Sequence, residues 1–297
     1  MASAEAVVPT LSIRVRGSVK GSHGRLCLGP RGVALARPIG GAGLGMTTGR
    51  ATPVAMGRAY RARPGETGGV AAELRSLTVD IDTGRWRDTV LTEVDLRVRD
   101  GQVTVLLGGP GDGKTMVAYA LTGRLPESAR TIGEVLVDGR VGYVPQDGID
   151  AFARDRSVGA QLRELISGDG AWTVDQACAA ACYPLEALDL LPQHNSAGQI
   201  QRAAVAAALL ADPDVLIADS PTASLDQGTA FGVWKSIREY ADTGAAVLVI
   251  THDMPLLIAT GYADHLVIMS KGQVVAAGSL DDLIVSDDSR VRMYFRS

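Results

Sequence analysis

Two short segments of this sequence hold the residue types that bind nucleotide phosphates and a magnesium ion. The first, Gly108-Gly-Pro-Gly-Asp-Gly113-Lys114-Thr115, matches G-x-x-x-x-G-K-[ST] at every fixed position. In that pattern backbone N–H groups close around the phosphates, the lysine reaches the β- and γ-phosphates, and the hydroxyl ligates magnesium. The second segment is Val215-Leu-Ile-Ala-Asp219, where a carboxylate that can hold the same metal ends an apolar run. Together they predict a site for ATP and Mg²⁺. The residues of the first segment assigned to the nucleotide are Gly108, Gly109, Pro110, Gly111, Asp112, Gly113, Lys114, Thr115 and Met116.

These side chains need strands and a helix to position them. Val103 to Leu107 is a short β-branched run before the glycines, and a helical stretch follows through about Leu121. Val141 to Val144 reads as another short strand, which is followed by Pro145 and Gln146. Ala245 to Ile250 is a further apolar run, and it ends in Thr251-His252-Asp253. The phosphate motif therefore lies in its required context, with a strand before it and a helix after it.

The order of these motifs resembles the ATP-binding-cassette (ABC) ATPase family. Along the chain come the phosphate loop, a glutamine, Asn195-Ser-Ala-Gly-Gln, the aspartate strand, Ser224-Leu-Asp226 and the strand before His252. The resemblance covers about Leu74 to Leu283, and its subgroup looks most like importers of peptides or nickel. It implies an α/β fold, in which a P-loop NTPase parallel-sheet core carries an antiparallel β-subdomain and a helical subdomain.

The family resemblance implies a role for each matching position. Gln146 would touch magnesium and the attacking water, so that Thr115, Gln146 and Asp219 form the metal set. His252 would contact the γ-phosphate, although a histidine at a strand end is often only structural. Trp86 is the nearby aromatic for stacking on adenine, and a half-exposed hairpin aromatic is the alternative. The positions assigned to the ATP bound by a second subunit are Asn195, Ser196, Ala197, Gly198, Gln199 and Asp226.

The sequence departs from the family at the position after Asp219. The family usually has a glutamate there to polarise water, and this chain has Ser220. A serine cannot act as a general base near neutral pH without a base of its own. General acid–base help is typically worth about 10²–10⁴ in rate. We therefore expect weak hydrolysis at this chain's own phosphate loop, with Gln146, Ser220 and His252 as the candidate catalytic positions.

Two further departures concern the loops that meet phosphate. The family signature L-S-G-G-Q reads Asn195-Ser-Ala-Gly-Gln here, so that an amide replaces a packed leucine and Ala197 adds a methyl group. Weakened contact with the phosphate across the dimer is the expectation. In the phosphate loop, Asp112 adds negative charge close to phosphate, which is unfavourable unless magnesium or Lys114 offsets it. The alternative is that the Asp112 side chain points to solvent.

Charge and glycine are unevenly distributed along the 297 residues. Residues 1–70 hold nine arginines and one lysine against two glutamates, a net charge of +8, and the remainder carries −12. That segment also has 14 of the 35 glycines and no persistent helical or strand period. It is predicted to be a low-complexity, disordered extension. A transit peptide and a start codon assigned too far upstream, with Met46 or Met56 as the true start, are the alternatives.

Residues 71–297 are predicted to form the ABC ATP-binding domain. Residues 74–101 and 131–145 alternate apolar and polar side chains and contain turn signals, which predicts the antiparallel β-subdomain. The stretch 147–194 predicts the helical subdomain, with helical periods in 158–166 and 174–182. No run of 18 apolar residues occurs, so no spanning helix is expected. Three cysteines without a metal-ligand cluster suit a reducing compartment.

The expected function is the ATP-binding subunit of an ABC transporter, which couples ATP binding and hydrolysis to transport through separate membrane subunits. The expected cofactors are ATP and Mg²⁺. The expected partners are a second ABC ATPase subunit, with a heterodimer favoured, and transmembrane permease subunits, and no nucleic acid is expected. The chain would lie in the cytoplasm, peripheral on the membrane. A hydrolysis-deficient regulatory ABC protein and a non-transport ABC ATPase are the alternatives.

Overall fold

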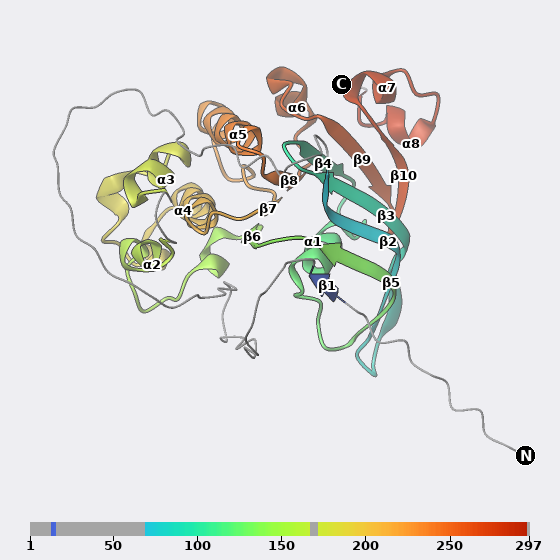
Figure 1. Cartoon of the computed structure of the whole chain (residues 1–297), viewed down its shortest axis with the longest axis horizontal. Helices are drawn as coiled ribbons and strands as arrows, with labels where there is room; N and C mark the ends of the chain where they lie inside the picture. The colour runs from blue at the N-terminus through green and yellow to red at the C-terminus, as the bar shows by residue number, and fades with distance from the viewer. Residues whose placement is uncertain (1–12, 16–68, 167–171, 296–297) are drawn as a thin grey trace, which may run out of the picture.

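The computed structural model describes residues 13–15, 69–166 and 172–295, which form an α/β architecture with two sheets (Figure 1). The strands are β1 (Ile13–Val15), β2 (Val70–Asp82), β3 (Arg87–Arg99), β4 (Val103–Leu107), β5 (Ala129–Val137), β6 (Val141–Val144), β7 (Val215–Asp219), β8 (Ala246–Ile250), β9 (His265–Ser270) and β10 (Gln273–Gly278). The α-helices are α1 (Lys114–Thr122), α2 (Val158–Glu164), α3 (Val174–Ala180), α4 (Ala197–Leu210), α5 (Gln227–Asp242), α6 (Met254–Thr260), α7 (Leu280–Ile284) and α8 (Ser289–Arg292). Short 3-10 helices are η1 (Gly148–Ala151), η2 (Leu185–Ala187) and η3 (Pro192–His194).

The larger sheet has six strands in the order β10-β9-β4-β8-β7-β6. All its neighbouring pairs are parallel except β10 with β9. Every residue of β4, β7 and β8 is buried, as expected for a parallel sheet covered on both faces. Alternate side chains of β4 enter opposite cores, with Val105 and Leu107 on one side and Leu106 on the other. This sheet fixes the strand ends that carry the predicted site.

The smaller sheet has the order β1-β5-β2-β3, in which β2 pairs antiparallel with both β3 and β5. Helix α1 shares its hydrophobic core, because Val117, Ala118 and Leu121 belong to the same buried cluster as β2, β3 and β5. Helices α3, α4 and α5 share the other core, on the opposite face of the parallel sheet. Figure 1 shows α2, α3 and α4 gathered at one end of the molecule and the smaller sheet at the other.

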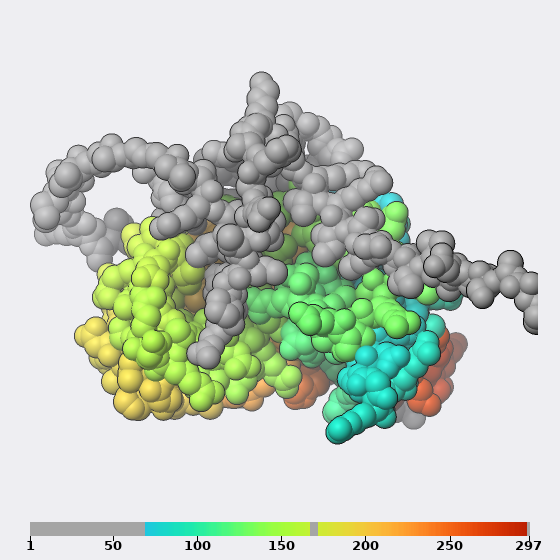
Figure 2. Space-filling view, turned by 90° about the horizontal axis from the view of Figure 1, so that it is seen from below, coloured from blue at the N-terminus to red at the C-terminus, as the bar shows by residue number. Residues whose placement is uncertain are grey.

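The predicted antiparallel subdomain is confirmed for 74–101 and for β5, but its extension to residue 145 is wrong. Strand β6 pairs parallel with β7 and belongs to the larger sheet. The chain turns at Gly139, which has a φ of 89°, and Arg140 and Asp214 then exchange hydrogen bonds where β6 and β7 begin. Figure 2 shows the cyan β2–β3 hairpin beside the green β5 region, away from the yellow-green α2 region.

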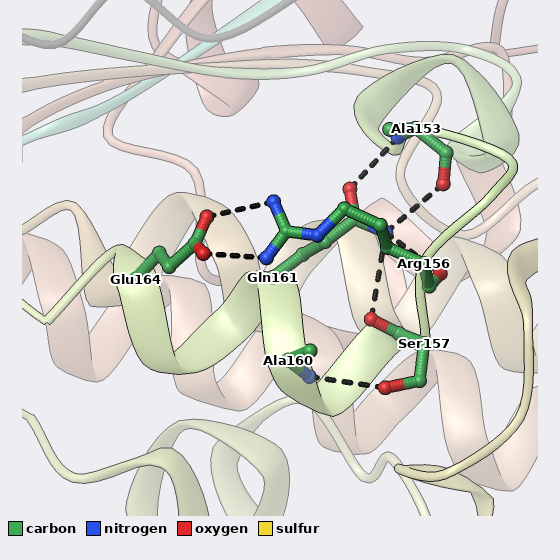
Figure 3. Close-up of polar contacts among 6 residues, drawn as sticks. All are labelled: Ala153, Arg156, Ser157, Ala160, Gln161 and Glu164. Carbon is green, nitrogen blue, oxygen red and sulfur yellow. Dashed lines mark hydrogen bonds and ion pairs between the residues drawn. The ribbon is translucent and has the colours of Figure 1, made fainter.

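The segment leading into α2 is held by its own polar side chains (Figure 3). Ser157 is the N-cap and accepts a hydrogen bond from the Ala160 N–H at 3.3 Å. The Gln161 amide accepts from the Ala153 N–H at 2.8 Å and donates to the Ala153 carbonyl at 3.0 Å. Arg156 also pairs with Glu164 on the surface, where such a pair is worth about 0–1 kcal/mol. The amide contacts therefore order this part of the predicted helical subdomain more than the ion pair does.

The structure contains helices in both periods predicted for residues 147–194, α2 and α3, although these are short and alternate with 3-10 turns. Residues 167–171 lie outside the described residues, as do 1–12 and 16–68 of the predicted disordered extension. Within that extension, residues 13–15 form β1 and pair parallel with β5. None of the helices in the described ranges has the length and apolar character needed to span a bilayer.

Candidate functional site

Four neighbouring strands of the parallel sheet end at the candidate site. Strand β4 leads into the phosphate loop, β7 ends in Asp219, β8 leads to His252, and β6 leads to Gln146. These strands are adjacent in the order β4-β8-β7-β6. Because their parallel carboxyl ends meet at one edge, four segments far apart in the sequence are brought to one place. Ligands of open α/β sheets bind at that edge.

The phosphate loop joins β4 to α1 through Gly113, the N-cap of the helix. Gly113 has a φ of 91°, and an added Cβ would lie 2.8 Å from the Val90 carbonyl oxygen. The position therefore requires glycine, because both its conformation and its space exclude a side chain. The Lys114 ammonium donates to the Gly108 and Gly109 carbonyls at 2.9 and 2.7 Å. Burial lowers the pKa of Lys114, and the Asp112 and Asp219 carboxylates oppose that shift.

The two predicted metal ligands on different elements lie in direct contact. The Thr115 hydroxyl on α1 donates to Asp219 Oδ2 at 2.9 Å. Asp219 is only 1% exposed, and its burial raises the pKa of the carboxyl group above 3.8, while Thr115 and Lys114 lower it. A buried carboxylate beside a hydroxyl oxygen is the donor set that Mg²⁺ prefers. The residues present therefore fit a nucleotide-bound magnesium ion.

A cavity of about 760 Å³ opens beside this pair. Gln146 lines it together with Thr115 and Asp219, so the structure brings the three predicted metal-contacting residues together. Tyr119 and Tyr143 form another wall, where their rings meet edge to face with centroids 6.3 Å apart. Sequence reasoning missed these aromatic residues, because tyrosines on a helix and a strand resemble ordinary core residues.

Ser220 stands directly after Asp219, in the left-handed region with a φ of 50°. Its N–H donates to the Ile250 carbonyl at 2.8 Å, which ties it to the end of β8. Its hydroxyl lies 3.5 Å from Asp219 Oδ1 and the residue is 8% exposed. The structure therefore places a neutral hydroxyl beside the carboxylate that is predicted to bind magnesium.

His252 and Trp86 both lie on the surface, and their assigned contacts stay predictions. His252 follows β8 and is exposed. Trp86 closes the β2–β3 hairpin, where its carbonyl accepts from the Thr83 N–H at 3.0 Å. The Trp86 residue is 52% exposed. A half-exposed indole fits stacking on a base, and equally fits a hairpin aromatic without a ligand.

The signature residues begin helix α4. Ser196 is its N-cap, and a capping box links the Ser196 hydroxyl to the Gln199 N–H and the Gln199 side chain to the Ser196 N–H. Asn195 is held from both ends of its amide. Tyr183 donates its hydroxyl to Asn195 Oδ1 at 2.9 Å, and Asn195 Nδ2 donates to the Leu191 carbonyl at 3.0 Å. The amide that replaces leucine is thus fixed by hydrogen bonds.

The close approach within the signature falls at its surviving glycine. A Cβ added to Gly198 would lie 2.9 Å from the Ser224 carbonyl oxygen. Ala197, by contrast, is exposed at the first residue of α4, where alanine suits a helix. Asp226 is the exposed N-cap of α5 and accepts from the Thr229 N–H at 3.0 Å. The signature and Asp226 therefore lie at two helix starts on the surface, accessible to a second chain.

Asp112 does not point to solvent, so that alternative is wrong. Its carboxylate accepts from the Gly109 N–H at 2.5 Å and from the Lys271 N–H at 2.8 Å. The contact with Lys271 spans 159 positions, and sequence spacing held no signal for it. Among the predicted nucleotide-contacting residues, Pro110 and Gly111 are exposed at the loop tip and Met116 packs against the smaller-sheet core.

Comparison with known proteins places this chain among cassette ATPases. The family model described as ABC transporter matches residues 91–223. The oligopeptide transport ATP-binding protein OppD of Mycobacterium tuberculosis is 32% identical over 243 residues, which cover 71% of this chain and 39% of that protein. The zinc import ATP-binding protein ZnuC of Alkalilimnicola ehrlichii is 34% identical over 213 residues, covering 70% and 77%. The chain thus spans about two fifths of the length of the oligopeptide relative.

Solved structures show the same fold. A post-hydrolysis dimer of the ATP-binding cassette MJ0796 bound to ADP and Pi superimposes with a TM-score of 0.61, at 21% identity, covering 70% of this chain and 98% of that one. A solved ATP-binding subunit of an ABC transporter gives a TM-score of 0.62 at 22% identity, covering 76% and 100%. With the family model, the ZnuC relative and the arrangement of the phosphate loop in agreement, the chain belongs to the ABC transporter family of ATP-binding proteins.

Proposed function

We propose that this protein is the ATP-binding subunit of an ABC transporter, whose own nucleotide site holds MgATP and hydrolyses it slowly. The observation that carries the proposal is that Thr115, at the start of α1 next to Lys114, is hydrogen-bonded to Asp219 and lines one cavity with Asp219 and Gln146. Two relatives that share this sequence region are named for oligopeptide transport and zinc import. Those names support transport as the process that nucleotide binding drives.

The residues of the chain would divide the work of holding the nucleotide. The loop's backbone N–H groups and the start of α1 hold the phosphates, because both present partial positive charge. Lys114 would exchange its carbonyl contacts for the β- and γ-phosphates. Thr115 and Asp219 would hold Mg²⁺, with Gln146 beside them. When bound, the metal neutralises charge on the phosphate oxygens.

Slow hydrolysis follows from the chemistry at the end of β7. Water that attacks the γ-phosphate must lose a proton, and Ser220 offers no basic group to take it. Gln146 can orient the attacking water but cannot accept its proton, because an amide is not basic at neutral pH. His252 is the other polar side chain assigned to this site, and it supports a residual activity. The same reasoning supports the alternative of a hydrolysis-deficient regulatory subunit.

We favour a heterodimer for the working assembly. The signature residues at the start of α4 and Asp226 at the start of α5 would complete the phosphate site of a second ABC ATPase subunit. That partner would supply the glutamate that this chain lacks, so most turnover would occur at the partner's nucleotide. Transmembrane permease subunits would complete the transporter at the cytoplasmic face of the membrane. Peptides or nickel are the favoured substrates for import, and the name of the oligopeptide transport relative agrees with peptides.

A reconstituted pair tests this proposal. An assembly recovered through a tag on this chain is expected to contain a second ATPase and membrane subunits. Removing the glutamate of the second ATPase should nearly abolish phosphate release, whereas Lys114→Ala in this chain should reduce it less. If Lys114→Ala is the more damaging change, or the chain alone is an active homodimer, the asymmetric assignment fails.

A further inference from the structure

The tip of the phosphate loop is closed by a pair of reciprocal hydrogen bonds. The Asp112 N–H donates to the Gly109 carbonyl at 3.3 Å, and the Gly109 N–H donates to Asp112 Oδ2 at 2.5 Å. The chain therefore forms a turn over residues 109–112, and the Asp112 side chain holds this turn closed. Because exposed glycine-rich turns have many accessible conformations, such a closure restricts the loop strongly.

Asp112 also connects this tip to a turn far away in the sequence. Its other carboxylate oxygen, Oδ1, accepts from the Lys271 N–H at 2.8 Å, and its carbonyl accepts from the Gly272 N–H at 3.3 Å. Lys271 has a φ of 50°, so the turn between β9 and β10 is tightly formed. The same turn is also hydrogen-bonded to β3 of the smaller sheet, because the Thr92 N–H donates to the Gly272 carbonyl at 2.9 Å.

Both carboxylate oxygens of Asp112 therefore already accept hydrogen bonds in the absence of a nucleotide. Each carboxylate oxygen accepts a backbone N–H, and the ammonium of Lys114 attracts the same carboxylate. Hydrogen bonds to a charged acceptor are about twice as strong as neutral ones. A carboxylate held in this way links the phosphate loop to the β9–β10 turn. Because the surrounding donors offset its negative charge, it repels phosphate less strongly.

We propose that Asp112 is a positioning residue, which keeps the phosphate loop in its binding shape and joins it to the β9–β10 turn at Lys271 and Gly272. The proposal rests on the proposed nucleotide site, and it goes beyond that site by assigning a role to a side chain that need not touch phosphate. It predicts that the loop loses affinity for phosphates when the carboxylate is removed. A carboxylate that acted mainly by repelling phosphate would have the opposite effect.

The test compares Asp112→Ala and the more conservative Asp112→Asn with Asp95→Ala in the full-length protein. Asp95 is a matched control, because its carboxylate also accepts a backbone N–H, from Ser76 at 2.9 Å, in the smaller sheet. Titration with MgATP and MgADP should show affinities about 10–100-fold weaker for Asp112→Ala, the range for losing hydrogen bonds to a charged group. The affinity of Asp112→Asn should lie between those of the wild type and Asp112→Ala, because its single amide oxygen can replace only one of the two accepting carboxylate oxygens.

Hydrogen exchange without nucleotide supplies a second readout. The amides of Gly109 and Lys271 should exchange at least 10-fold faster in Asp112→Ala than in Asp95→Ala, at equal melting temperature. Tighter nucleotide binding in Asp112→Ala, or unchanged affinity in a folded variant, would overturn the positioning role. Equal exchange in the two alanine variants would overturn it as well, even if the wild-type protein failed to bind MgATP. Failure of the wild type alone to bind would count against the proposed function instead.

Discussion

Replacing Ser220 by glutamate should give this chain's own nucleotide site the base that it lacks. The backbone of residue 220 is fixed at a φ of 50°, and its N–H is bonded to the Ile250 carbonyl. A side chain at this position therefore leaves the strand end next to Asp219, as the 3.5 Å separation between Ser220 Oγ and Asp219 Oδ1 indicates. A longer carboxylate at this position would lie near the Asp219 side chain, where the proposed Mg²⁺ would bind.

The expected gain follows from the chemistry of proton transfer, and the expected cost follows from burial. A positioned general base contributes about 10²–10⁴ in rate, which corresponds to roughly 3–5 kcal/mol of barrier. Ser220→Glu should therefore raise turnover at least about 100-fold where the signature of a partner completes the site. In the absence of magnesium it adds a second carboxylate beside Asp219, whose pKa burial already raises, so the melting temperature should fall.

Steady-state phosphate release from the assembled pair measures the gain, with the partner's own glutamate replaced so that only this site reports. Ser220→Gln is the matched control, because it has the length of glutamate and no basic oxygen pair. The reasoning is refuted if the glutamate and glutamine variants turn over equally. A rise in both would mean that side-chain length, and not the base, had limited the reaction.

Further predictions concern stability, pH and the first 70 residues. Tyr183→Phe should cost about 1–3 kcal/mol in urea unfolding, because the partly buried amide oxygen of Asn195 and the carbonyl of Ala187 both lose the hydroxyl that they share, whereas Tyr183→Phe with Asn195→Leu should recover only the part of this cost that Asn195 contributes. Burial raises the pKa of Asp219 in the folded state, so the stability that its proton gives is present at low pH and is lost as pH rises through the folded pKa. Without nucleotide, Asp219→Asn should therefore melt at a higher temperature than the wild type, and this difference should grow as the pH rises above the ordinary pKa of 3.8. A difference that stays constant across pH would contradict the raised pKa of Asp219. A chain that starts at Val70 loses only β1 among the described elements and should keep its melting temperature within about 2–4 °C, the change that 1 kcal/mol gives a domain of this size.

The sequence predicted the elements and residues that short-range patterns govern. A β-branched run before glycines predicted β4, and the apolar run that ends at Asp219 predicted β7. The contact between Thr115 and Asp219 was expected, because the motif assigned both to one ion, and the structure shows their atoms 2.9 Å apart. These features follow from strand periodicity and from the chemistry that a phosphate site requires.

Long-range hydrogen bonds could not be predicted in the same way. The partners of Asp112 at Lys271 and of Asn195 at Tyr183 depend on which loops the sheets bring together. The sequence placed Val141 to Val144 with the antiparallel strands, because a short alternating strand after a turn has no signal for the sheet that it joins. Its parallel partner β7 becomes evident only when the strand order is known.

The most direct test of the central claim, that this chain holds MgATP at a site that hydrolyses it slowly, is the identity of the nucleotide that it retains. The purified chain is mixed with MgATP labelled on the α-phosphate, separated from free nucleotide, and quenched with acid for chromatography. The wild type is expected to retain label as intact ATP, and Lys114→Ala is expected to retain none, because its phosphate loop lacks the ammonium contact. Equal retention by Lys114→Ala, or label recovered from the wild type mostly as ADP at the earliest time point, would contradict the account.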